Sequence, residues 1–140
     1  MKGNGFITWM LRSPLHGMLS SSTMLVTVTG CKSGRQITTP VNYAQEGNTL
    51  WITSFRKRSW WRNLRGGRPV VLQIKGKEVQ GWGRAIEVEP EVEQALGQYL
   101  QRLPQTAKYF DVALDEQGQP RPEDIARAAQ DRVVVEIVIE

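Results

Sequence analysis

Apolar and β-branched residues along this chain fall into short runs separated by turn-forming residues, a pattern typical of strands joined by hairpins. Glycines lie in the turns Gly30–Arg35 and Glu46–Asn48, which separate the first three runs. Pro40 lies inside the second run, and because proline cannot donate to a ladder, we expect an edge or a bulge there. The six segments predicted as strands are Met24–Thr29, Gln36–Tyr43, Thr49–Ser54, Pro69–Lys75, Glu78–Val88 and Arg132–Ile139.

Apolar residues recur with helical spacing in three places: at the N-terminus, in one segment between two predicted strands, and in the C-terminal third. Ser13 followed by Pro14 is typical of an N-cap with proline at the first helical position, and Pro90 and Pro122 are also placed to begin helices. The predicted helices are Phe6–Leu11, Leu15–Leu19, Trp60–Arg65, Glu91–Arg102, Pro104–Phe110 and Pro122–Gln130.

Hairpin-linked strands with helices inserted late predict a mainly β fold, an antiparallel barrel of six strands with short helices around it. At 140 residues without a linker, the chain is expected to form a single domain, residues 1–140. The apolar N-terminal segment is expected to pack in the core or on a second copy in a homodimer. Peripheral contact with a membrane surface, or a lid over a substrate, is the alternative.

Charge divides the chain into two unequal parts. Residues 1–84 contain 13 Lys and Arg against two acids, whereas residues 85–140 contain five against 12 acids. A basic body with an acidic end indicates a localised anion site rather than a surface for a long polyanion, so no nucleic-acid partner is expected. One cysteine, no signal-peptide pattern and no continuous apolar run of membrane-spanning length favour the cytoplasm.

The turn Lys32–Arg35 is the first candidate site. Flanking glycines let backbone N–H groups approach an anion, Ser33 adds a hydroxyl, and Lys32 and Arg35 add charge. Arg35 can bind a phosphate or carboxylate through two parallel bonds. A merely solvent-exposed basic turn is the alternative, and the spacing matches neither a P-loop nor a Rossmann fingerprint.

The second candidate is Ser54–Gly67, which combines five cations, two adjacent tryptophans and no acid. A helix beginning near Ser59 would direct free N–H groups at an anion. Trp60 and Trp61 point in different directions on a helix, so at most one should face a ligand. The segment Arg65–Gly67 is interpreted as an exit turn.

The remaining chemistry is sparse. With one histidine and one cysteine, we expect no metal site, and no Ser-His-Asp or Cys-His arrangement is expected. An anion site beside aromatic rings, without acid–base machinery, suits a redox cofactor that performs the chemistry itself.

Taken together, Thr29–Arg35, Pro40, Tyr43 and Gly47, followed by Ser54 and Trp60–Leu64, resemble the deazaflavin (F420)-dependent nitroreductase family. This family is a branch of the flavin and deazaflavin oxidoreductases with an FMN-binding split β-barrel fold. The resemblance covers roughly residues 20–110. It implies a six-stranded antiparallel split barrel that binds F420, with FMN as the alternative, and an oxidoreductase that transfers a hydride to a small-molecule acceptor such as a nitro compound or a quinone.

The resemblance also implies roles for individual residues. Lys32 and Ser33 would contact the phosphate or the acidic tail of the cofactor, and Tyr109 would lie on the substrate side as a catalytic residue. Thr106 stands where the family has another tyrosine, and Cys31 where it usually has arginine. The residues implied to line the ring, hold the phosphate region or flank the cofactor are Thr39, Pro40, Val41, Asn42, Thr53, Ser54, Phe55, Arg56, Ser59, Trp60, Trp61 and Asn63.

Two other classes of protein remain open from the residues alone. The first is a nucleic-acid-binding barrel that uses Arg56–Arg68, with Trp60 as a stacking platform. The second is a barrel that binds a lipid or another hydrophobic ligand without catalysis.

Overall fold

The computed structural model describes residues 23–139 of the chain. The two helices predicted before Pro14 and after it lie outside this range, as does any membrane contact made through them. Within the described residues, no helix is long and apolar enough to cross a membrane.

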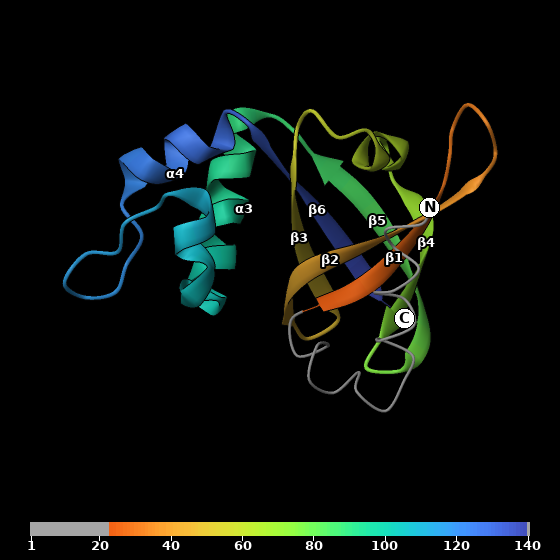
Figure 1. Ribbon diagram of the computed structural model, residues 1–140, viewed down its shortest axis with the longest axis horizontal. Coiled ribbons are helices and arrows are strands. Elements are labelled where there is room, and N and C mark those ends of the chain that lie inside the picture. The colour runs from red at the N-terminus through yellow and green to blue at the C-terminus, as the bar shows by residue number, and fades with distance from the viewer. Residues whose placement is uncertain (1–22, 140) are drawn as a thin grey trace.

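Six antiparallel strands close into a barrel in the order β1-β2-β3-β6-β5-β4 (Figure 1). The mainly β prediction is confirmed, and each strand lies within three residues of its predicted bounds at either end. The C-terminal strand β6 inserts between β3 and β5, which closes the barrel. The strands are β1 Thr23–Thr29, β2 Gln36–Glu46, β3 Thr49–Phe55, β4 Arg68–Ile74, β5 Lys77–Ile86 and β6 Arg132–Ile139.

The strand period of two divides the apolar residues between two cores. Leu50 and Ile52 of β3 point into the barrel, whereas Trp51 between them points outward. The outward side is covered by helices α3 (Glu89–Arg102) and α4 (Pro122–Ala129) and by the 3₁₀ segment η2 (Pro104–Phe110), which lie together on one side of the barrel in Figure 1. The helices predicted in the C-terminal third are therefore confirmed.

A further 3₁₀ segment, η1 (Trp60–Leu64), follows β3 and packs inside one end of the barrel. Its first two residues and its last one are buried among the inward-facing strand residues. The helix predicted over Trp60–Arg65 is thus present, one residue shorter and more tightly wound than an α-helix.

Strands β2 and β3 separate shortly after their shared hairpin, as Figure 1 shows. Their ladder covers Tyr43–Glu46 and Thr49–Ile52, so Gln36–Asn42 pair only with β1 on the described strands. Gly30 donates to the carbonyl of Arg35, and ladder bonds alternate from there, so the nitrogen of Pro40 faces away from β1. The expected edge at Pro40 is therefore observed, on the open side of β2.

Candidate functional site

The turn between β1 and β2 faces η1 across a cavity of about 480 Å³, which we call the basic cavity. Three exposed cations line it, Lys32 from the turn and Arg62 and Arg65 from η1 and its exit. Of the predicted site residues, the structure brings Lys32, Ser33, Ser59 and Asn63 together here. The full lining is Gly30, Cys31, Lys32, Ser33, Ile37, Ser59, Arg62, Asn63 and Arg65.

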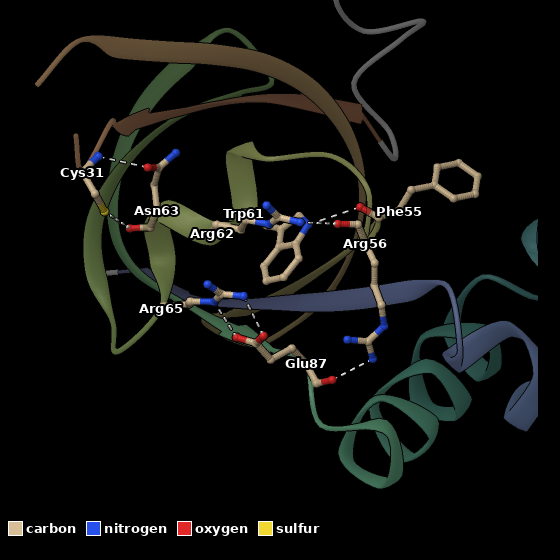
Figure 2. A network of polar contacts seen from close by, with 8 residues as sticks. All are labelled: Cys31, Phe55, Arg56, Trp61, Arg62, Asn63, Arg65 and Glu87. Atoms are coloured by element: carbon tan, nitrogen blue, oxygen red, sulfur yellow. Dashed lines mark hydrogen bonds and ion pairs between the residues drawn. The ribbon is translucent and has the colours of Figure 1, made fainter. Parts of the chain in front are cut away.

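Asn63 joins the two walls of the basic cavity (Figure 2). Its Oδ1 accepts the backbone N–H of Cys31 at 3.0 Å, and its Nδ2 donates to the carbonyl of Trp60 at 3.0 Å. The Cys31 Sγ donates to the Asn63 carbonyl at 3.7 Å. The amide of Asn63 therefore sets the position of the turn relative to η1.

Arg65 is held at the rim of the basic cavity by Glu87, which follows β5. Its Nε and Nη2 donate to the two carboxylate oxygens of Glu87 at 2.9 and 3.0 Å, a fork-to-fork pair drawn in Figure 2. These hydrogen bonds raise the pKa of Arg65 above its ordinary value. Arg65 therefore lies in the exit turn, as interpreted from the sequence, and in addition it lines the basic cavity.

The two tryptophans pack beneath the residues that line the basic cavity. Trp60 is 4% exposed and Trp61 2% exposed, and neither lines the basic cavity. The Trp61 ring lies beneath both arginines, 5.5 Å from the guanidinium carbon of Arg62 and 5.2 Å from that of Arg65. Because η1 is packed into the end of the barrel, neither tryptophan faces the basic cavity, which agrees with the expectation that at most one would face a ligand. Burial also removes Trp60 as a stacking platform for a nucleic acid.

Arg56, predicted to hold a phosphate, points elsewhere. Its Nη2 donates to the carbonyls of Glu87 at 2.6 Å and Ala129 at 3.3 Å, so it ties the end of β5 to the end of α4. Its side chain lines no cavity near the turn, and its Nε is buried without a hydrogen-bond partner. Arg35 is exposed and lies outside the lining of the basic cavity.

A second cavity of about 390 Å³, which we call the aromatic cavity, opens where β2 and β3 separate. The predicted residues Asn42, Thr53, Ser54, Phe55 and Tyr109 meet there. Sequence reasoning did not assign Tyr99, Phe110 and Arg132 to a site, and Thr106 was noted only for its place in the family pattern. The full lining is Asn42, Thr53, Ser54, Phe55, Tyr99, Thr106, Tyr109, Phe110 and Arg132.

Hydrogen bonds fix the β3 wall of the aromatic cavity. Trp60 Nε1 donates to Ser54 Oγ at 3.1 Å, and Trp61 Nε1 donates to the carbonyl of Phe55 at 3.2 Å. On the opposite side, burial raises the pKa of Tyr99 to about 12, so its phenol remains protonated at neutral pH. Tyr109 is 67% exposed and lies at the mouth.

The open edge of β2 runs from one cavity to the other. Ile37 lines the basic cavity and Asn42 the aromatic cavity, and five residues of extended strand span about 17 Å. Between them, Thr39 and Val41 are buried, and Thr39 Oγ1 accepts a hydrogen bond from Arg58 Nη2 at 3.4 Å. The predicted ring-lining residues Thr39, Pro40 and Val41 therefore lie between the two cavities.

Solved structures with low sequence identity share this fold. A protein from Listeria innocua described as a putative pyridoxamine 5'-phosphate oxidase has a TM-score of 0.57 at 16% identity, over 90% of each chain. A general stress FMN/FAD-binding protein from Xanthomonas citri has a TM-score of 0.54 at 16% identity, over 100% of this chain and 86% of its own. A structure described as an F420 reductase has a TM-score of 0.50 at 15% identity, over 91% and 94% of the two chains.

These neighbours place the fold among the split-barrel proteins that include flavin-binding and F420-linked members. No curated protein matches the chain significantly. The family model described as F420H(2)-dependent quinone reductase matches residues 13–114, and the chain belongs to this family. The protein is therefore an F420-dependent oxidoreductase, and the resemblance stated from its sequence motifs is confirmed.

The residues present fit this cofactor. An acidic tail requires clustered cations, which the basic cavity provides from Lys32, Arg62 and Arg65. A flat ring requires an extended surface, and Gln36–Asn42 of β2 form a ladder with β1 alone among the described strands.

Proposed function

We propose that the protein transfers a hydride from reduced F420 to a small organic acceptor carrying a quinone, nitro or enone group. One observation carries the proposal: a basic cavity and an aromatic cavity lie at the two ends of a β2 segment that, among the described strands, forms a ladder with β1 alone. The acidic tail belongs in the first cavity and the acceptor in the second, with the ring along β2 between them.

The basic cavity binds the tail through Lys32, Arg62 and Arg65, with Ser33 and Asn63 as further polar groups. Arg62 and Arg65 are pre-positioned over the Trp61 ring, which reduces the rotamer entropy lost when an anion binds. Phosphate and carboxylate groups accept such charge-assisted bonds equally, so this cavity discriminates by charge more than by shape.

The aromatic cavity positions the acceptor against the ring. Phe55 and Phe110 provide apolar walls, whereas Ser54, Thr106 and Tyr109 place hydroxyl groups around them. Bound F420 in its reduced form supplies the hydride. A proton then reaches the acceptor oxygen from Tyr109 at the mouth, or from solvent that has access beside it.

Equilibrium binding of F420 and turnover of its reduced form test this proposal. The purified protein should bind F420 at low salt and oxidise the reduced form when a quinone such as menadione is added. Lys32→Ala should weaken F420 binding by about tenfold or more, since one charge-assisted bond is lost. Lys77→Ala is the matched control, because Lys77 is an exposed lysine that lies outside both cavities.

FMN is the second candidate, supported by the fold shared with an FMN/FAD-binding protein. Parallel titrations with FMN distinguish the two, since FMN lacks the acidic tail and should depend less on Arg62 and Arg65. If the protein binds neither compound, the proposed function is wrong.

A homodimer and a cytoplasmic location remain predictions. A structure of similar fold is described as a domain-swapped dimer, with a TM-score of 0.53 at 18% identity over 94% of this chain and 98% of its own. Sedimentation velocity of the full chain would decide whether this protein also assembles in pairs.

A further inference from the structure

Arg132 occupies an unusual position for a cation. It is the first residue of β6 and pairs directly with Phe55, the last residue of β3, so the barrel register places it at the wall of the aromatic cavity. Its side chain is only 11% exposed. A buried charge requires compensation, so the surroundings of this guanidinium indicate what else it can bind.

Two aromatic rings and two acceptors hold the Arg132 guanidinium. Its carbon lies 3.9 Å from the ring centre of Phe55 and 5.1 Å from that of Phe110. Nη1 donates to the Asp131 carboxylate at 2.6 Å, and Nη2 donates to the carbonyl of Tyr109 at 3.2 Å. The other guanidinium N–H groups of Arg132 have no hydrogen-bond acceptor among the described side chains and backbone groups.

The Asp131 carboxylate that compensates Arg132 lines a neighbouring cavity, which shares Phe55, Tyr109, Phe110 and Arg132 with the aromatic cavity. Asp131 is 66% exposed and does not line the aromatic cavity, so its charge is largely screened by solvent. Of the described residues that line the aromatic cavity, Arg132 alone carries a formal charge at neutral pH. The cavity therefore combines a mostly apolar lining with one rigidly held cation.

The geometry points to Arg132 as the residue that binds the acceptor oxygen on which negative charge develops. This inference rests on the proposed function. An acceptor quinone that gains a hydride has gained two electrons and one proton, so one oxygen carries a negative charge until a second proton arrives. The charged oxygen accepts a charge-assisted hydrogen bond from the Arg132 guanidinium.

The same contact defines an acceptor class. The ring of the acceptor packs between Phe55 and Tyr109, and its oxygen faces the guanidinium. Flat acceptors whose reduced oxygen is anionic gain this interaction in the transition state, where it lowers the barrier. Acceptors without such an oxygen gain only the apolar contact.

Binding of a matched pair of aromatic probes tests the inference in the absence of F420, so that neither probe can be reduced. Calorimetry compares 4-nitrophenolate with 4-nitroanisole, a neutral probe of the same ring, at a pH above the phenol pKa. Wild type should prefer the anion by about ten- to a hundredfold, the range of one charge-assisted hydrogen bond. Arg132→Gln should remove this preference while affinity for the neutral probe stays within twofold.

Two variants separate Arg132 from the other cations. Lys32→Gln removes a cation of the basic cavity and should leave the anion preference unchanged. Arg127→Gln removes a neighbouring cation that pairs with Asp124 and lies outside the aromatic cavity, and it should also leave the preference unchanged. Asp131→Asn should increase affinity for the anion severalfold, because it removes the carboxylate beside the guanidinium.

If Arg132→Gln unfolds the protein, Arg132→Lys retains the charge and should retain part of the preference. Wild type with equal affinity for both probes overturns the inference whatever the variants do, and so does an anion preference that Lys32→Gln abolishes. In turnover, Arg132→Gln should lower kcat for menadione more than it raises KM. If wild type binds the anion through Arg132 but never oxidises reduced F420, the proposed function has failed and the anion site stands.

Discussion

Neutralising Glu87 should strengthen binding of an anionic tail in the basic cavity. The Glu87 carboxylate occupies one edge of the Arg65 guanidinium through two hydrogen bonds at 2.9 and 3.0 Å. Glu87→Gln removes the negative charge and preserves the side-chain volume. The backbone carbonyl of residue 87, which binds Arg56, is unaffected.

The expected magnitude follows from Coulomb's law. If Glu87 and an anionic group of the tail bind opposite edges of the Arg65 guanidinium at about 2.9 Å, their oxygens lie roughly 7 Å apart. Repulsion between unit charges at that separation corresponds to about threefold in affinity in bulk water and about fiftyfold at an effective dielectric constant near 20. Because the Arg65 side chain is 55% exposed, we expect a gain of about three- to tenfold at low salt.

Fluorescence titration with F420 at low and high salt measures this effect. The gain should nearly disappear at 1 M salt, where the screening length falls to about 3 Å. Glu136→Gln is the matched control, since Glu136 pairs with Arg84 at 3.0 Å on the outer face of the barrel and lines neither the basic nor the aromatic cavity. Weaker binding by Glu87→Gln would refute the reasoning and indicate that Glu87 acts by orienting Arg65.

Three further predictions concern stability. Ser54→Ala leaves the buried Trp60 Nε1–H without its acceptor and should cost about 1–3 kcal/mol in urea unfolding, much of it recovered in the double variant with Trp60→Phe. Gly67→Ala should cost at least about 1 kcal/mol, since Gly67 has φ +89° and a Cβ would lie 2.6 Å from Trp82 Nε1; unchanged urea stability would contradict this. The pKa of Asp124 lies below its ordinary value because its carboxylate accepts a backbone N–H, so wild type should be more stable than Asp124→Asn at neutral pH. Thermal unfolding should show that this difference begins to shrink near about pH 4 and disappears as the pH falls through the lowered pKa.

The strands could be predicted from the sequence because their signals are local. Alternation in segments such as Thr49–Phe55 and the glycine turns between them depend on neighbouring residues alone. The Lys32–Ser33 turn was also correctly placed at a cavity, since both of its flanking strands and its glycines are adjacent in sequence.

The roles of the arginines could not be predicted in the same way. Arg56 and Arg65 lie nine residues apart in one basic segment, and their partners are more distant along the chain, at Glu87 and Ala129. Only closure of the barrel brings Arg56 to the carbonyls that follow β5 and end α4. The same closure places Arg65 at the basic cavity. The spacing of Arg62 and Arg65 by three residues was the available signal that both share one helical face.

The position of Arg132 depends on topology in the same way. Its strand was predicted with the correct bounds, but insertion of β6 between β3 and β5 is what sets Arg132 opposite Phe55. A lone arginine at the start of an apolar strand carries no such information by itself.

The open side of β2 has a consequence for aggregation. A strand edge that carries no ladder can add a strand from another molecule and so initiate intermolecular sheets. Pro40 places its nitrogen on that side, so the donor series between Gln36 and Asn42 is interrupted and an incoming strand cannot form a regular ladder. Pro40 therefore keeps this edge from pairing with strands of other molecules. It still leaves the edge accessible to a flat ligand, which binds a surface without forming a ladder of backbone hydrogen bonds.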